Sequence, residues 1–251
     1  METDRRLRPL VSIVIPVLND TPALQRCLAA LAAHTAISFE TFVCDGGGDA
    51  ACAAAAESFG ARYVRSDPGR AVQMNAGAAL ASGEWHWFLH ADCTPSPGSL
   101  EALAAVDARR TWGCFRHRLD APGLSLRIIE AADNLRARLF ALPYGDQGIF
   151  VRRDAFEKLG GYATVPLLED VLLARALARS GSPRVLRPVL RTDARRWLRR
   201  GILATTLTNW RVLYMHFIAG RPLDEIAAYY RGTPNPESGS VRKNESVSGA
   251  S

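Results

Sequence analysis

Short apolar runs alternate with helical segments along this chain, and that alternation limits the possible folds more than any other feature. Val11–Leu18, Phe39–Cys44 and Ala61–Arg65 are such runs, and a helical segment follows each of the first two. Strands that are apolar on both faces are typical of parallel sheets, because helices cover both sides of the sheet. We therefore predict an α/β fold with a mostly parallel central sheet flanked by helices.

Similar patterns divide the rest of the chain. Trp85–Leu89 is a fourth predicted strand, and a helical segment that begins at Gly69 precedes it. Residues 232–251 contain Pro, Ser, Gly and charged residues with almost nothing to bury, which predicts a disordered tail. Between these segments we predict a helix that starts near Pro97 and three further helices over Leu124–Phe140, Leu167–Arg179 and Gly201–Gly220. We also predict strands over Thr111–Leu119 and Gly148–Arg152.

Composition narrows the class of protein. The 251 residues are 48% hydrophobic, enough to bury one substantial core. The net charge is +6, and every basic residue except Lys158 and Lys243 is arginine, which suits contact with phosphate or carboxylate. Coding bias is the alternative explanation of this arginine content. No basic stripe is interleaved with aromatic residues, so we expect no nucleic-acid partner.

Cysteine usage and the N-terminus indicate the compartment. The five cysteines form no CxxC pair, which favours reduced thiols in a cytoplasmic protein over a disulfide frame or a zinc site. The run RRLRPLVSIVIPVL superficially resembles a signal peptide, but it ends in Asn19-Asp20-Thr21-Pro22 without a small-residue cleavage pattern. We expect this segment to be retained as a strand.

Polar residues directly follow the predicted strands. Asn19 follows the first strand, Asp45 the second and Asp92 the fourth. Because open α/β sheets bind ligands at the carboxyl ends of their strands, we expect these side chains and Arg70 to share one crevice. A carboxylate at Asp92 can hold Mg²⁺ or Mn²⁺ against a diphosphate. Capping of the helix that starts near Pro97 is the alternative role for Asp92.

The turn DGGGD, residues 45–49, differs from known dinucleotide-binding loops. Its spacing is not GxGxxG and no phosphate-binding lysine follows, which disfavours a Rossmann dehydrogenase. Its glycines would let the backbone approach a base or ribose, with Asp45 accepting a hydrogen bond from a ring N–H. The alternative is a turn that contains glycine only because it needs positive φ angles.

Two acidic residues begin one of the predicted helices. On Leu167–Arg179, Glu169 and Asp170 face away from Arg175 and Arg179. Carboxylates that point into the domain are compatible with a catalytic pair. The alternative is that these acids only interact favourably with the helix dipole.

The segment Gly201–Gly220 is strongly apolar, but Asn209, Arg211 and His216 within it argue against a membrane span. We expect this helix to pack on the domain. Peripheral membrane contact through residues 199–220, at the inner face of the cell membrane and with a lipid-like acceptor, is the second interpretation.

Five motifs in order carry a resemblance to a known family. VSIVIPVLND, VCDGGGDA, GRAVQMNAGAALASG with FLHAD, GDQGIFVRRDAFEKLGGY and LLEDVLLARAL resemble those of the family 2 glycosyltransferases of GT-A fold, over Val11–Arg200. The segments HAD and TDARRW resemble the corresponding motifs of the bacterial subgroup named "transferase 2, rSAM/selenodomain-associated". The resemblance implies a GT-A domain over residues 8–200, with a nucleotide-sugar half (8–94) and an acceptor half (95–200), followed by a helical annex (201–231).

The resemblance also implies roles for individual residues. Asp170 corresponds to the general base and Glu169 to its neighbour that positions the base or acceptor. Asp92 matches the metal-binding last acid of the DxD motif, whereas His90 stands where the first acid contacts the ribose. The implied donor-binding residues are Pro16, Asn19, Asp45, Gly46, Arg70, Asn75, His90, Asp92 and Arg196, and the implied acceptor-binding residues are Asp146, Gln147 and Trp197.

The implied reaction is an inverting transfer of a sugar from a nucleotide-diphosphate donor to an acceptor hydroxyl, with Mg²⁺ or Mn²⁺ as cofactor. Two alternatives are open. His90 in place of an acid is compatible with a non-catalytic protein that binds sugar nucleotides. A nucleotidyltransferase on a similar sheet is the other, although it would need a glycine-rich basic loop where this chain has VLNDTP.

Overall fold

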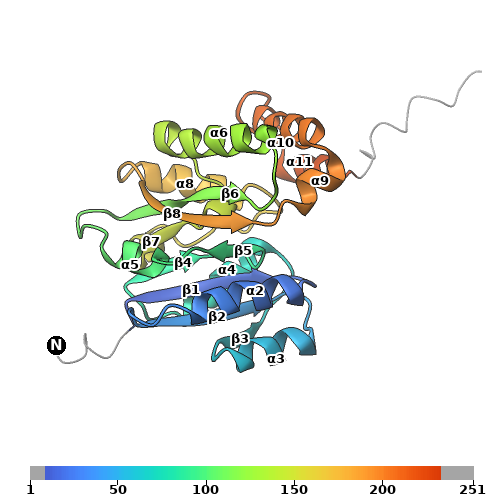
Figure 1. Cartoon of the computed structure of the whole chain (residues 1–251). Helices are drawn as coiled ribbons and strands as arrows, with labels where there is room; N and C mark the ends of the chain where they lie inside the picture. Colours follow the sequence, from blue (N-terminus) through green and yellow to red (C-terminus); the bar gives the residue numbers. More distant parts are fainter. Residues whose placement is uncertain (1–8, 233–251) are drawn as a thin grey trace, which may run out of the picture.

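The computed structural model describes residues 9–232, with an eight-stranded sheet at its centre (Figure 1). The strand order is β3-β2-β1-β4-β7-β6-β8-β5. The first four strands of the chain run parallel and confirm the predicted α/β fold. These four strands and their helices form the parallel half of the domain, which consists of β1 (Val11–Val17), α2 (Thr21–Ala32), β2 (Phe39–Asp45), α3 (Ala50–Ser58), β3 (Arg62–Arg65), α4 (Arg70–Leu80) and β4 (Trp85–Phe88).

Alternate side chains of β1 enter two different hydrophobic cores, one on each face of the sheet. Ile13 and Ile15 pack in the core that includes residues of α2 and α3. Val14, between them, packs in the core that includes residues of α4. Every residue of β1 is buried, which explains why the strand is apolar at both alternating positions apart from Ser12, whose hydroxyl donates a hydrogen bond to Glu40.

Helix α4 lies unusually close to the sheet. A Cβ atom at Gly77 would lie 2.6 Å from both Val14 Cγ1 and Cys44 Sγ, so only glycine permits this approach. At the other end of the helix, the Gln73 amide donates hydrogen bonds to the carbonyls of Val17 (2.6 Å) and Cys44 (2.7 Å). These bonds fix the first turn of α4 at the carboxyl ends of β1 and β2.

The second half of the sheet is mixed. β7 is antiparallel to β4 and β6, β8 is parallel to β6, and β5 is antiparallel to β8. The elements are β5 (Cys93–Pro95), α5 (Ser99–Ala104), β6 (Trp112–Leu119), α6 (Leu124–Phe140), η1 (Gly145–Gln147), β7 (Phe150–Arg152), α7 (Arg153–Lys158), α8 (Glu169–Ala178), β8 (Arg184–Thr192), α9 (Arg195–Arg200), α10 (Ile202–Phe217) and α11 (Leu223–Arg231). Strands β5 and β8 were not predicted, because arginines and Pro188 interrupt the apolar residues of β8 and β5 is very short.

The C-terminal helices lie against the mixed half of the sheet (Figure 1). α10 packs on the domain through the buried residues Thr205 and Val212, as expected for this segment. No helix within residues 9–232 has both the length and the hydropathy to cross a bilayer. Gly232, with a φ of 79°, caps α11 and therefore does not belong to the predicted tail. Residues 233–251, the remainder of that tail, lie outside the described residues.

Candidate active site

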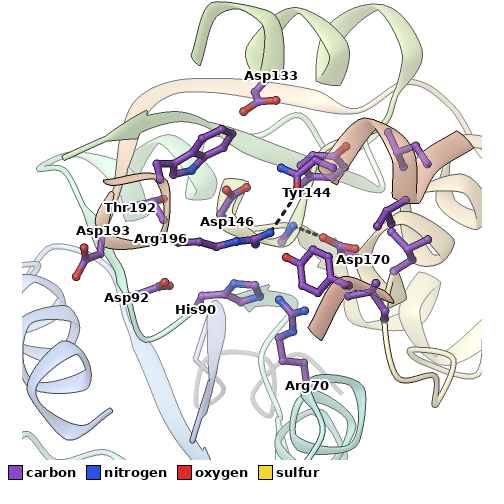
Figure 2. A pocket seen from close by; sticks show the side chains of 18 residues that line it. Arg70, His90, Asp92, Asp133, Tyr144, Asp146, Asp170, Thr192, Asp193 and Arg196 are labelled. Carbon is purple, nitrogen blue, oxygen red and sulfur yellow. Dashed lines mark hydrogen bonds between the residues drawn. The ribbon is translucent and has the colours of Figure 1, made fainter. Parts of the chain in front are cut away.

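A cleft opens where the two halves of the sheet meet (Figure 2). Arg70 from the start of α4 and Asp92 after β4 approach it from the parallel half. Asp146 in η1, Asp170 at the start of α8 and Arg196 in α9 approach it from the other half. The residues predicted for the site that line the cleft are Arg70, His90, Asp92, Asp146, Asp170, Arg196 and Trp197.

Asp170 is held in place by two backbone N–H groups. One carboxylate oxygen accepts a hydrogen bond from the N–H of Gly145 at 2.6 Å, and the other accepts from the N–H of Val171 at 2.7 Å. Leu168, two residues before Asp170 and the N-cap of α8, has a φ of 67°, a left-handed conformation that bulky residues rarely adopt. Such strain persists where surrounding structure enforces it, often at functional sites. The carboxylate of Asp170 is therefore fixed at the cleft wall.

Glu169 has a different environment from its neighbour. Its side chain is only 3% exposed, and one carboxylate oxygen lies 2.9 Å from Nε of Arg70. Burial raises the pKa of Glu169 and the nearby charge of Asp170 adds to this, while the guanidinium of Arg70 opposes both. The pairing orients Arg70, whose side chain is half-exposed and borders the cleft. Both predicted acids thus lie at the inner side of α8, but only Asp170 lines the cleft.

His90 lies across the floor of the cleft, next to the backbone of Gly145 (Figure 2). A Cβ atom at Gly145 would lie 2.6 Å from His90 Cε1 and 3.4 Å from Asp170 Oδ2. Glycine at this position therefore allows an imidazole and a carboxylate to approach the same backbone. This contact explains the first glycine of the sequence motif GDQG, because a side chain at that position has no room.

Asp92 faces the cleft from the parallel half of the sheet. Its backbone carbonyl accepts a hydrogen bond from the N–H of Asp193 at 3.1 Å, which ties the loop after β4 to the end of β8. It does not cap the following helix, because α5 begins after Gly98 without a side-chain cap. Within residues 9–232 no three His, Cys, Asp or Glu side chains form a ready-made metal site. One carboxylate fits an Mg²⁺ or Mn²⁺ ion whose other ligands are diphosphate oxygens and water.

Arg196 crosses the middle of the cleft between Asp146 and His90 (Figure 2). Its Nη2 atom donates a hydrogen bond to Asn209 of α10 at 3.2 Å. Its guanidinium carbon lies 4.5 Å from the ring centroid of Tyr230 in α11. The C-terminal helices therefore aim this cation into the cleft, and residues 201–231 contribute directly to the site.

The DGGGD turn lies apart from the residues that line this cleft. The carboxylate of Asp45 is fully buried and accepts hydrogen bonds from the N–H groups of Gly47 (2.8 Å) and Asp49 (2.7 Å) and from the hydroxyl of Tyr63 (3.0 Å). Gly48 adopts a φ of 70°, so the turn does need a glycine. Asp45 therefore orders the turn, and its contact with a nucleobase stays a prediction.

Several predicted donor- or acceptor-binding residues make structural contacts, and their binding roles stay predictions. The amide of Asn75 exchanges two 2.9 Å hydrogen bonds with the backbone of Tyr162. Gln147 is fully buried beneath the cleft and bonds the backbone of Tyr144 and Phe115. None of the four predicted residues Pro16, Gly46, Asn75 and Gln147 is among the residues that line the cleft, and the exposed Asn19 also lies outside it.

The structure adds a histidine that sequence analysis missed. His117 on β6 is buried, with Nδ1 3.7 Å from Asp146 Oδ2 and Nε2 3.8 Å from Asp133 Oδ2. Neither ring nitrogen has a hydrogen-bond partner within the described residues. Burial raises the pKa of Asp133, while the adjacent Arg136 opposes this effect. The only signal in the sequence was a histidine between the arginines of RHR, at the position that faces inward.

A second cluster of charged side chains lies near the end of β1. Arg195 in α9 forms an ion pair with Asp20, the N-cap of α2, and also contacts Asp193. Burial alone would raise the pKa of Asp20, but the hydrogen bond and charge of Arg195 outweigh this and lower it. This contact links α9 to the parallel half of the sheet across 175 positions of sequence.

The fold and the sequence identify the family. Residues 12–160 match the model of glycosyl transferase family 2, and this chain belongs to that family. Its architecture is the GT-A fold, as the solved structures described below also indicate.

Two curated relatives show sequence similarity. The PGL/p-HBAD biosynthesis glycosyltransferase of Mycobacterium bovis (strain BCG / Pasteur 1173P2) is 37% identical over 170 residues, which cover 61% of this chain and 63% of the relative. Uncharacterized protein MT1568 of Mycobacterium tuberculosis (strain CDC 1551 / Oshkosh) is 31% identical over 102 residues, which cover 39% of this chain and 32% of the relative. The matches thus span less than two thirds of either relative.

Two solved structures share the fold. Mannosyltransferase PcManGT from Pyrobaculum calidifontis, in complex with GDP-Man and Mn²⁺, has a TM-score of 0.58 at 17% identity, covering 82% of this chain and 60% of that chain. Glucosyl-3-phosphoglycerate synthase from Mycobacterium tuberculosis, in complex with Mn²⁺, UDP and glucosyl-3-phosphoglycerate, has a TM-score of 0.57 at 19% identity. The match covers 94% of this chain and 84% of that chain. Membership of the narrower rSAM-associated subgroup stays a prediction.

Proposed function

We propose that this protein transfers a sugar from a nucleotide-diphosphate donor to an acceptor hydroxyl with inversion at the anomeric carbon. One observation carries the proposal: the carboxylates of Asp92 and Asp170 enter one cleft from opposite sides, with Arg70 and Arg196 bordering the space between them. A base on one side, a carboxylate that can hold a metal on the other and cations between them suit an in-line displacement. The solved relatives bound to GDP-Man or UDP support a nucleotide-sugar donor.

Asp170 serves as the general base. The acceptor hydroxyl transfers its proton to the Asp170 carboxylate while its oxygen forms a bond to the anomeric carbon. The bond from that carbon to the donor oxygen breaks, and its electron pair leaves with the nucleotide diphosphate. Because Asp170 is held by the N–H of Gly145 at 2.6 Å, its orientation does not depend on the acceptor.

The leaving diphosphate meets the positive groups of the cleft. Arg70, oriented by Glu169, and Arg196, oriented by Asn209, supply guanidinium groups that offset the developing charge. Asp92 would hold an Mg²⁺ or Mn²⁺ ion, which supplies a Lewis acid on the diphosphate when bound. His90 and the turn at Asp45 would contact the ribose and base, and Asp146 with Trp197 would contact the acceptor.

Thermal stabilisation by nucleotide sugars tests this proposal. A panel of UDP-, GDP- and dTDP-sugars is added with and without Mn²⁺, and the melting temperature is recorded. A donor at about 100 times its dissociation constant should add about 2.7 kcal/mol of stability. Transfer to acceptors is then followed by NMR, which reports the anomeric configuration of the product. No stabilisation by any nucleotide sugar, or a product with retained configuration, would contradict the proposal.

A further inference from the structure

The outer surface of α10 is apolar, whereas its inner surface combines polar residues with the buried Val212 and the partly buried Leu213. Leu203, Leu207, Trp210, Tyr214 and Ile218 are between 58% and 79% exposed, and they recur every three or four residues along one stripe. By contrast, Thr205 is buried and Asn209 bonds Arg196 in the cleft. A helix that only packed on a protein core would have the opposite arrangement, with its apolar stripe inward.

Helix α6 repeats this arrangement. Leu124, Ile128, Leu135 and Leu139 are between 53% and 77% exposed and follow the same helical spacing. Its acidic residues are turned inward, since Glu130 is buried against the backbone of β6 and Asp133 borders the cleft. The exposed side of α6 therefore has no carboxylate.

The two helices lie on the same outer side of the sheet (Figure 1). Ile129 of α6 and Ile202 of α10 pack on one hydrophobic cluster, and Leu142, just after α6, packs with Leu213 of α10 on another. The apolar stripes of α6 and α10 together form what we call the outer apolar face. A continuous exposed surface of this kind indicates a binding partner, because single exposed apolar residues are common but large patches are not.

The charges on this face are of one sign. Arg138 of α6, Arg199 and Arg200 at the end of α9, and Arg211 of α10 are all exposed. Helices α9 and α10 contain no acidic residue at all. A basic helix pair with exposed Leu, Trp and Tyr matches an anionic lipid surface, where aromatic rings lie at the headgroup level and arginines meet lipid phosphates.

We propose that the outer apolar face seats this protein on an anionic lipid bilayer, with α6 and α10 lying in the plane of the interface. A second copy of the chain is a poorer occupant, because a two-fold interface would bring the same arginine-bearing surface together on both sides. The inner side of α10 contributes Asn209, Val212 and Leu213 to the cleft. Seating on a bilayer would therefore place the acceptor end of the cleft next to the membrane surface.

Vesicle flotation of the full chain tests this proposal. The probes are phosphatidylcholine vesicles with and without phosphatidylglycerol, each at low and high salt. We expect binding to the phosphatidylglycerol vesicles that weakens as salt rises, since salt screens the arginine contacts. The double variant Leu207→Ser with Trp210→Ser should bind about tenfold less, because it removes apolar area from the interface. Arg199→Gln with Arg211→Gln should remove most of the preference for phosphatidylglycerol.

Two controls make the result specific. Phe59→Ser changes an exposed aromatic residue (40% exposed) at the far end of the sheet and should leave flotation unchanged. All variants should keep the wild-type melting temperature, because the substituted side chains are exposed. The proposal is overturned if the wild type does not float with anionic vesicles, or if Phe59→Ser reduces flotation as much as the double variant. It is also overturned if the double variant only converts a dimer to a monomer in light scattering.

Discussion

Asp170→Asn is the substitution that tests the proposed mechanism most directly. Asparagine has nearly the same shape as aspartate but cannot accept the acceptor proton. Its single carbonyl oxygen can still accept the hydrogen bond from Gly145 N–H, now 2.6 Å from the carboxylate. Its amide NH₂ would then face the N–H of Val171, which bonds the other carboxylate oxygen at 2.7 Å. The variant therefore loses one backbone hydrogen bond and one charge.

The expected magnitudes for stability and catalysis differ widely. A hydrogen bond to a charged group contributes about 1.5–3 kcal/mol and a neutral one about 0.5–1.5 kcal/mol, so we expect a loss of about 1–2 kcal/mol. For a chain of this size that corresponds to a melting temperature about 2–8 °C lower. General-base catalysis contributes about 10²- to 10⁴-fold, so kcat should fall by that factor. Donor affinity should stay within a few-fold, because the cations that hold the diphosphate are unchanged.

The assay is steady-state transfer with the best donor from the panel, together with donor titration by calorimetry. Asp154→Asn is the matched control, since Asp154 also lies in the first turn of a helix but is 66% exposed and pairs only with Lys158. It should leave kcat unchanged. An Asp170→Asn variant that melts lower yet turns over normally would refute the base assignment and leave a helix-dipole role. A kcat loss from Glu169→Gln equal to that from Asp170→Asn would also contradict it.

Three further predictions concern the metal, the cleft floor and pH. Asp92→Ala should abolish the Mn²⁺-dependent part of donor affinity without lowering the melting temperature. Donor titration with Mn²⁺ present and absent measures this. A donor affinity that still depends on Mn²⁺ as in the wild type would exclude Asp92 as a metal ligand. Gly145→Ala should impair transfer because its Cβ would lie 2.6 Å from His90 Cε1. When it is combined with His90→Ala, the two substitutions should show an interaction energy of about 0.5–3 kcal/mol. Additive effects of the two substitutions would argue against this contact. Because Arg195 holds the pKa of Asp20 below its ordinary value of 3.8 despite the opposing effect of burial, their bond stabilises the fold above that pH and is lost as pH falls through the lowered value. Arg195→Gln should therefore destabilise the protein near pH 7 but not in strong acid, as measured by urea unfolding, and a gap that persists in acid would contradict this.

Some features of this protein follow from local sequence alone. The alternation of buried strands and helices between Val11 and Phe88 confirms the predicted α/β fold, because a strand apolar on both faces needs helices on both sides. Residues directly after these strands reach the carboxyl edge for the same topological reason. Asp92 lines the cleft as predicted, and so do Arg70 and Asp170, whereas Asn19 and Asp45 at the same edge lie outside the cleft. The chemical roles of the lining residues stay proposals.

Other features depend on contacts between segments distant in sequence. Asn75 lies in a motif predicted to bind the donor, yet its amide bonds Tyr162, 87 positions away. His117 meets Asp133 and Asp146 only because β6, α6 and η1 converge. Such pairings have no local signature, since they are set by how the sheet is assembled.

The orientation of the amphipathic helices was decided only by the tertiary structure. The sequence shows that Leu124–Phe140 and Gly201–Gly220 each have an apolar and a polar side, but periodicity does not state which side faces the domain. In the folded chain, α10 turns Asn209 and Val212 inward and Trp210 outward, since Asn209 bonds Arg196 in the cleft and Val212 packs in a hydrophobic cluster. Local pattern thus determined the elements, and long-range packing determined which of their surfaces remain available for binding.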